Sequence, residues 1–148
     1  MIYLDILTVV CIGLLIGTEF TVSVFINPVL QRLDTGTRMK TISYFAKRLG
    51  TAMPFWYAFS LLLLVTEALL RRHVDGGSLL ITASVLWLTV IVLTLMFLVP
   101  INNRMMRLDT NSSAETSLKE HAKWEMLHRG RVAVLTASMV CFLLAIFH

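Results

Sequence analysis

Residues 79–99 read LLITASVLWLTVIVLTLMFLV, a run of 21 residues without a charged side chain. The hydrocarbon core of a bilayer is about 30 Å thick, and roughly 20 helical residues cross it. No water is available there to bond exposed backbone groups, so a spanning segment must satisfy its own amides and carbonyls. The run therefore predicts a transmembrane α-helix.

Three more apolar runs flank this one. Residues 6–30 and 49–70 each contain a single charged residue, Glu19 and Glu67 respectively, and residues 132–147 contain none. The last run has only 16 residues, so its helix must begin upstream. The sequence predicts an all-α protein with one domain, a four-transmembrane-helix bundle. The predicted spans are about residues 4–28, 50–71, 78–100 and 127–147.

Two cytoplasmic amphipathic extensions are expected, one before the second helix and one before the fourth. Apolar residues recur every three or four positions from Met39 to Met53, and Pro54 is expected to kink the helix that follows. The segment 111–113, Asn-Ser-Ser, predicts the start of a helix that runs into the last span. Pro100 is expected to end or bend the third span.

The composition agrees with a membrane protein. The chain is 57% hydrophobic and 15% charged, with a mean hydropathy of +0.77, whereas soluble domains are about 25% charged. Eleven of the thirteen Lys and Arg residues lie in the first and third connections. The positive-inside rule then predicts that both termini face outside and that these connections are cytoplasmic, in a multi-pass protein of the plasma (inner) membrane. Basic residues spread in this way do not indicate nucleic-acid binding.

Two cysteines lie at comparable depth near the outer ends of the first and last spans. Cys11 and Cys141 could pair if those helices touch, but we expect them to act as small buried hydrophobes. The absence of a Cys-x-x-Cys motif argues against a disulfide-exchange enzyme.

Glu19 is the most informative residue of the first span. A charged group at membrane depth costs at least about 2.5–3.5 kcal/mol, so it is retained for a function or for a partner. Ser23 and Asn27 follow at four-residue steps and are expected on the same face. Pro28 is expected to distort the end of the helix and to leave a carbonyl free.

A polar face is also expected on the fourth helix. His121, Trp124, His128 and Arg131 step by three, four and three residues, with Glu125 on the flank. An arginine one turn into an apolar run needs a carboxylate, and Glu19 is the only one predicted at that depth. Structural pairing that fixes the helix register is the alternative interpretation of such polar groups.

The predicted topology brings these polar residues to one end of the bundle. A carboxylate, an imidazole and a guanidinium can serve as a base, a proton donor and a stabiliser of an enolate. The predicted catalytic residues are Glu19, His128 and Arg131. The residues predicted to bind a substrate are Asn27, Trp56, Tyr57, Asn102, Asn103 and Trp124. Phe20 is expected in the same apolar pocket.

A metal or haem is an alternative use of the same groups. Glu125 and His128 form one Glu-x-x-His step, but a di-iron bundle needs two such steps and two further glutamates. A mononuclear site with Glu19 and His128, completed by Glu125 or His121, stays open. So does a haem held by His128. Glu67, by contrast, is expected to pair with Arg71 in a structural role.

Three motifs together resemble a known family. They are Gly17-Thr18-Glu19-Phe20 with Phe25-Ile26-Asn27-Pro28, then Val99-Pro100-Ile101-Asn102-Asn103, and finally Trp124-x3-His128-x2-Arg131. This set is similar to the anthrone oxygenase-like family of small four-helix membrane proteins, long catalogued as a domain of unknown function. The resemblance implies a four-helix membrane fold and, from the fungal members, oxidation of an anthrone to an anthraquinone with molecular oxygen.

The resemblance also assigns the family's recurring polar positions. They map onto Glu19, Asn27, Pro28, Pro100, Asn102, Trp124, His128 and Arg131. The expected function is thus a membrane-embedded oxygenase acting on a hydrophobic, anthrone-like small molecule, with oxygen as co-substrate and no settled cofactor. Two other functions stay open: a small proton-coupled transporter and a non-catalytic haem- or metal-binding membrane subunit. The expected partners are bilayer lipid and the small molecule, and the sequence leaves a homo-oligomer open.

Overall fold

The computed structural model describes residues 1–107 and 114–147, and over those residues helices joined by short turns are its only regular secondary structure. Four helices are long and apolar enough to cross a membrane, at Ile2–Leu30, Thr35–Leu70, Gly77–Arg104 and Lys119–Phe147. The predicted four-helix bundle is therefore confirmed. The helix start expected at residues 111–113 lies outside the described residues.

We call each of the four membrane-spanning helical stretches a rod, in chain order. The first and third rods are each built from three helical segments. The first consists of α1 (Ile2–Thr21), a π-helical turn η1 (Val22–Ile26) and α2 (Asn27–Leu30). The third consists of α4 (Gly77–Leu93), a π-helical turn η2 (Thr94–Leu98) and α5 (Val99–Arg107). The second and fourth rods are the long helices α3 (Thr35–Leu70) and α6 (Ala114–Phe147).

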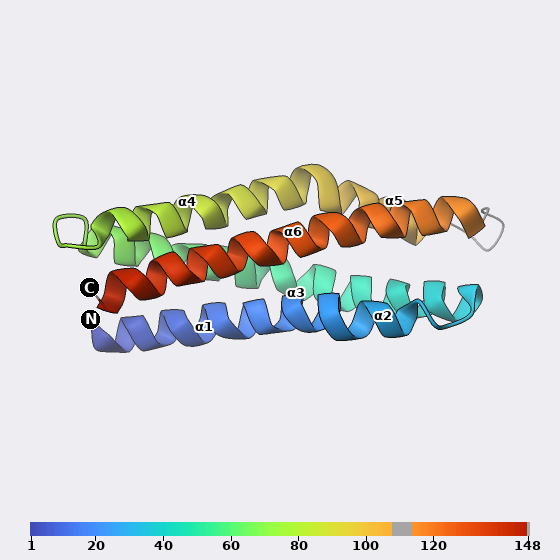
Figure 1. Ribbon diagram of the computed structural model, residues 1–148, viewed down its shortest axis with the longest axis horizontal. Coiled ribbons are helices and arrows are strands. Elements are labelled where there is room, and N and C mark those ends of the chain that lie inside the picture. Colours follow the sequence, from blue (N-terminus) through green and yellow to red (C-terminus); the bar gives the residue numbers. More distant parts are fainter. Residues whose placement is uncertain (108–113, 148) are drawn as a thin grey trace.

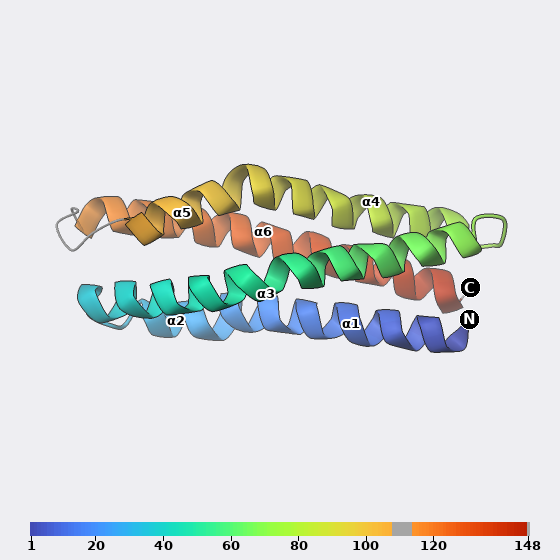
Figure 2. The same ribbon diagram turned by 180° about the vertical axis from the view of Figure 1, so that it is seen from behind.

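Both chain termini lie at one end of the bundle, beside the turn between α3 and α4 (Figure 1). We call this the terminal end. The connection between α2 and α3 lies at the opposite end, as the reverse view also shows (Figure 2). Most Lys and Arg residues lie in the segments near that opposite end, which we call the basic end. Successive rods are antiparallel, so α1 and α6 also run in opposite directions.

The chain reversals follow from local sequence chemistry. Asp34 caps α3, because its Oδ1 accepts a hydrogen bond of 3.0 Å from the Thr37 amide. Hydrogen bonding from Thr37 holds the pKa of the Asp34 carboxyl below its usual range. At the other end Gly76 adopts φ +86° directly before α4. A Cβ there would lie 2.8 Å from the Ala145 carbonyl oxygen, so the position requires glycine.

The core lies between the rods in the terminal half. Its fully buried members include Ile12, Leu64 and Trp87. The indole Nε1 of Trp87 donates to the Tyr57 carbonyl at 3.1 Å, and Ser138 Oγ donates to the Ala83 carbonyl at 2.8 Å. Such bonds link α4 to its neighbours where hydrophobic burial adds little, since lipid is itself apolar.

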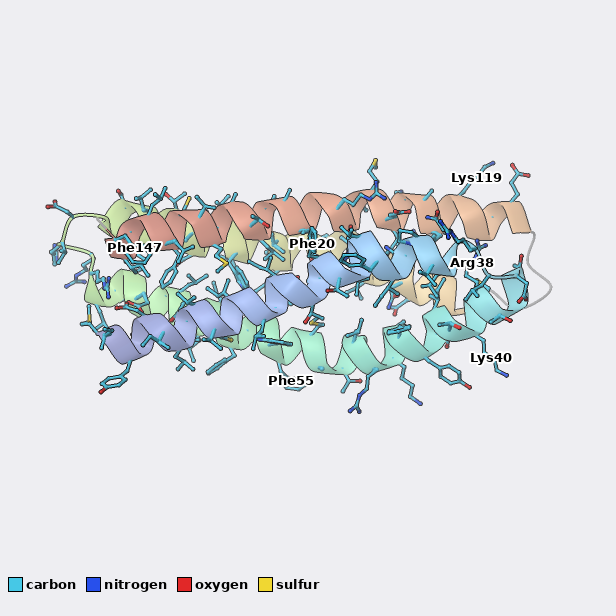
Figure 3. The ribbon with its side chains drawn as sticks, turned by 60° about the horizontal axis from the view of Figure 1, so that its bottom comes forward. Phe20, Arg38, Lys40, Phe55, Lys119 and Phe147 are labelled. Carbon is cyan, nitrogen blue, oxygen red and sulfur yellow. The ribbon has the colours of Figure 1, made fainter. Side chains whose placement is uncertain are left out.

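The outer surface is apolar, as lipid contact requires. Large side chains such as Leu14, Phe55 and Leu95 are well exposed, the reverse of the pattern in a soluble protein. Pro54 lies inside α3 without ending it, and the helix changes direction beside the labelled Phe55 (Figure 3). This is the kink expected from a proline that removes one backbone donor.

Each π-helical turn directly precedes a proline-containing pair. The Asn27 amide bonds to the Val22 carbonyl five residues back, and Pro28 follows. The Val99 amide bonds in the same way to the Thr94 carbonyl, and Pro100 follows. Proline cannot donate to the helical ladder, and a π turn is one way to absorb that loss. Pro100 therefore bends the third rod rather than ending it, since α5 continues to Arg107.

The two cysteines do not pair. Both are free thiols, and the Cys11 sulfur lies 3.4 Å from the Ser60 hydroxyl oxygen. They behave as the small, mostly buried side chains that we expected.

Candidate functional site

A cavity of about 400 Å³ lies among all four rods in the half toward the basic end. Its wall is mostly apolar, with Val22, Met53, Ile91 and Leu98 among the lining residues. The polar lining residues come from every rod: Glu19, Asn27, Tyr57, Thr94, Asn102, His121, Trp124, His128 and Arg131. An apolar cavity with a few convergent polar groups is the usual form of a small-molecule site.

Glu19 occupies the centre of the polar cluster and is 3% exposed. Its Oε2 accepts a hydrogen bond of 2.6 Å from Arg131 Nη2, which makes an ion pair between α1 and α6. Its Oε1 accepts a hydrogen bond of 2.8 Å from the Tyr57 hydroxyl on α3. The carboxylate predicted as the partner of Arg131 is thus the one that binds it.

His128 completes the cluster, and its tautomer follows from its neighbours. Arg131 Nη2 lies 2.8 Å from His128 Nδ1, and a guanidinium nitrogen can only donate. His128 Nδ1 therefore accepts, and the ring proton lies on Nε2, which donates to the Glu19 carbonyl oxygen at 3.1 Å. The two hydrogens of Nη2 are then used by the carboxylate and by the imidazole.

The backbone at Glu19 is arranged to accept that histidine. The Val22 amide is shared between the carbonyls of Thr18 and Glu19, at the point where α1 changes into the π turn. The regular backbone hydrogen bonding of the α-helix is thus interrupted beside Glu19. π turns of this kind occur frequently at functional sites.

Aromatic rings form one wall of the cavity along α6. Trp124 stacks on His128 at a centroid distance of 4.7 Å and an angle of 9°. His121 stacks on the other side of the same indole at 6.1 Å and 13°. The guanidinium of Arg131 lies over the Tyr57 ring, 5.8 Å from its centroid. The predicted polar face of the fourth helix therefore lies on the cavity, His121 included.

Three residues predicted for the pocket lie elsewhere. Trp56 points toward α1, where its Nε1 donates to the Cys11 carbonyl at 3.1 Å. Asn103 is exposed, whereas its neighbour Asn102 lines the cavity. Phe20 is 48% exposed and packs edge-to-face on Phe25. Each is one residue away from a lining position, and one residue turns a helix by about 100°.

The structure also adds residues that the sequence analysis did not single out. Thr94 and Leu98 on η2 line the cavity together with Asn102. These three positions step by four residues, a spacing that could have identified the inward face of the third rod. Tyr57 was expected to contact a substrate, but its hydroxyl bond to Glu19 was not foreseen.

Glu125 is turned away from the cluster. It accepts hydrogen bonds from Gln31 Nε2 at 2.9 Å and from Arg129 Nη2 at 2.5 Å. Within residues 1–107 and 114–147, no group of three or more His, Cys, Asp or Glu side chains is placed to hold a metal ion. The four suggested ligands, which also include Glu19, His121 and His128, are therefore not gathered around one point. A bound metal or haem stays a prediction.

A second charged cluster lies near the terminal end. Glu67 is fully buried, and its Oε2 lies 3.4 Å from Arg71 Nε, the pair that we expected. Arg71 Nη2 also bonds to Asp5 in a close ion pair. Asp5 escaped notice because it precedes the first apolar run. This cluster ties α1 to α3 and lies outside the cavity.

A family model matches most of the chain. Residues 39–141, more than two-thirds of the chain, match the family model described as "Anthrone oxygenase". The matched segment includes Tyr57, Asn102, His128 and Arg131, while Glu19 precedes it. No curated protein and no solved structure matches the chain. On the family match, this chain belongs to the anthrone oxygenase family.

Proposed function

We propose that this protein is a membrane-embedded oxygenase that oxidises a flat, hydrophobic small molecule with an acidic C–H group beside a carbonyl, as in an anthrone. One observation carries the proposal. The buried Glu19 carboxylate is held by Arg131 and Tyr57 at the wall of a mostly apolar cavity of about 400 Å³, and His128 donates to the backbone carbonyl of the same residue. The family match supports the same reaction class.

The reaction balances with the substrate and dioxygen as the only reactants. A base removes one proton from the methylene carbon and leaves an enolate. The enolate carbon bonds to dioxygen, and protonation gives a hydroperoxide on that carbon. Loss of water, by removal of the second C–H proton and cleavage of the O–O bond, leaves the new carbonyl. The carbon is oxidised, and one oxygen atom leaves as water.

The chain supplies groups for each proton step. Glu19 is the proposed base, because its carboxylate faces the cavity and is fixed on both oxygens. Arg131 lies beside it and can stabilise the negative charge that develops on the substrate oxygen. His128 is held as a neutral imidazole through its bonds to Arg131 and to the Glu19 carbonyl, and it can pass a proton. Trp124 offers a flat face on which an aromatic substrate can stack.

The test is oxygen-dependent quinone formation by the purified protein in lipid nanodiscs, with empty nanodiscs as the blank. Glu19→Gln, His128→Ala and Arg131→Ala are each expected to lose at least about 100-fold in rate, the scale of a general acid–base contribution. Glu67→Gln is the matched control, because it alters another buried carboxylate outside the cavity. Full activity in all three site variants would disprove the mechanism.

The same preparation separates the two alternative functions. Stoichiometric metal or a Soret band would favour the metal- or haem-binding subunit, and substrate-driven proton movement in proteoliposomes would favour the transporter. We also propose the orientation that the basic residues suggest, with both termini outside the plasma membrane. Alkaline phosphatase fused to either terminus should then be active in cells, and a cytoplasmic fluorescent reporter should not.

A further inference from the structure

The end of the cavity nearest the basic connections carries polar atoms without a protein partner. Asn27 is 2% exposed, and His121 is 7% exposed. The side-chain nitrogen of Asn27 and both ring nitrogens of His121 make no hydrogen bond to protein. Both residues line the cavity. Thr94 Oγ1 and Arg131 Nε, on residues that also line the cavity, are unpaired as well. Buried polar groups are nearly always paired, so the unpaired nitrogens of Asn27 and His121 indicate a ligand at this end of the cavity.

These two side chains lie at the same level of the bundle. Glu19 on the first rod contacts His128 and Arg131 on α6, and the two rods are antiparallel. Asn27 lies eight residues after Glu19 on the first rod. His121 lies seven residues before His128 on α6, so both lie toward the basic end. Both steps cover about 10–12 Å at 1.5 Å per residue, so the two groups share one layer.

The wall between the two polar layers is flat and apolar. Trp124 stacks between His121 and His128, and Ile91 and Leu98 line the same cavity. A ligand that fills this space has an apolar body about two helical turns long, with one polar group at each end. The reacting group would lie at Glu19 and a second polar group at Asn27.

We propose that Asn27 and His121 form a second polar subsite, which binds a hydroxyl group at the end of the substrate away from its reacting carbon. This inference rests on the proposed function. An amide nitrogen only donates, whereas a neutral imidazole has one nitrogen that donates and one that accepts. A hydroxyl group does both, so it can accept from Asn27 and donate to His121.

A carboxylate fits the subsite less well. It cannot donate to the bare imidazole nitrogen, and its transfer from water to this depth is costly.

The experiment measures binding rather than turnover, through quenching of tryptophan fluorescence by three fused tricyclic diketones. One has no substituent, one has a hydroxyl on an outer ring, and one has a methoxy group in its place. His121→Phe keeps a ring that can stack on Trp124, and Asn27→Leu keeps the side-chain size. Ile42→Val is the control, because it changes an apolar lining residue.

We expect wild type to bind the hydroxylated compound about tenfold more tightly than the other two, the effect of pairing buried polar groups. His121→Phe and Asn27→Leu should each remove most of that preference and leave binding of the unsubstituted compound unchanged. Ile42→Val should keep the preference.

Three results would overturn the inference. If the unsubstituted compound binds and the hydroxyl adds nothing, the subsite is wrong and the proposed function stands. Equal loss of all three compounds in the variants, or methoxy binding as tight as hydroxyl binding in wild type, would show that shape rather than a hydroxyl is recognised. If wild type binds none of them, the proposed function fails together with the subsite.

Discussion

Replacement of Arg131 by leucine tests whether the cluster around Glu19 is held by charge. Arg131 Nη2 lies 2.6 Å from Glu19 Oε2, and the two side chains are 12% and 4% exposed. The same nitrogen bonds to His128 at 2.8 Å. Removal of the guanidinium would leave a buried carboxylate with Tyr57 as its one remaining side-chain hydrogen-bond donor within the described residues.

Two different estimates of the loss of stability apply to this substitution. A side-chain hydrogen bond inside a membrane protein contributes on average about 0.6 kcal/mol and at most about 1.7 kcal/mol. Loss of one partner of a buried ion pair costs about 3–5 kcal/mol, because the other charge stays buried. Burial of both side chains favours the second case, so we expect Arg131→Leu to destabilise the protein by about 4 kcal/mol. Glu19→Gln keeps an acceptor for the arginine and should cost less.

The double variant is the decisive measurement. Because it removes both charges, its loss of stability should be smaller than the sum of the two single losses by at least about 1 kcal/mol. Reversible unfolding in mixed micelles with SDS, followed by circular dichroism, gives the three free energies. Pairing Arg131→Leu with Glu67→Gln, at the remote cluster, is the control cycle and should be additive. A coupling energy no larger than that of the control would refute the charged pair.

Three further predictions concern single positions. Gly76→Ala should destabilise the protein by at least about 1–2 kcal/mol, because of its positive φ and because the new Cβ would lie 2.8 Å from the Ala145 carbonyl oxygen. Gly50→Ala, in an open helical position, should be neutral or stabilising in thermal unfolding. Asp34 has a lowered pKa, so its capping contribution should be present at neutral pH and be lost as the pH falls below about 4, and the difference in melting temperature from Asp34→Ala should then shrink. Tyr57→Phe should slow quinone formation about tenfold, and Trp56→Phe, outside the cavity, should not.

The sequence was sufficient for the fold because length and hydropathy decide it. A charge-free run such as residues 79–99 has few alternatives to a membrane-spanning helix. The helix ends were less certain. Hydropathy falls where α3 and α5 extend toward the basic end, but the helical hydrogen bonds continue there. Asp5 was missed for a related reason, since a count of apolar runs discards the polar residues at their edges.

The sequence predicted how deep each site residue lies in the membrane, but not which way its side chain points around the helix axis. Arg131 needed a carboxylate at its own level, and only Glu19 was available, so that pair followed from position along the helix. Which way Trp56 or Asn103 faced did not follow. Depth changes by 1.5 Å per residue, whereas direction changes by about 100°. Neighbours such as Trp56 and Tyr57 therefore lie at nearly the same depth, but only Tyr57 lines the cavity.

The π turns explain why the polar face of the first rod nonetheless lies where simple spacing placed it. In a regular α-helix, eight residues from Glu19 to Asn27 would rotate the second side chain by about 80° away from the first. The turn Val22–Ile26 takes up one extra residue, which reverses about 100° of that rotation. Glu19, Ser23 and Asn27 are accordingly all buried. Residues four positions apart share one face here because the π turn is wider than a regular α-helical turn. The π turn also absorbs the loss of the backbone hydrogen bond that the following Pro28 cannot donate.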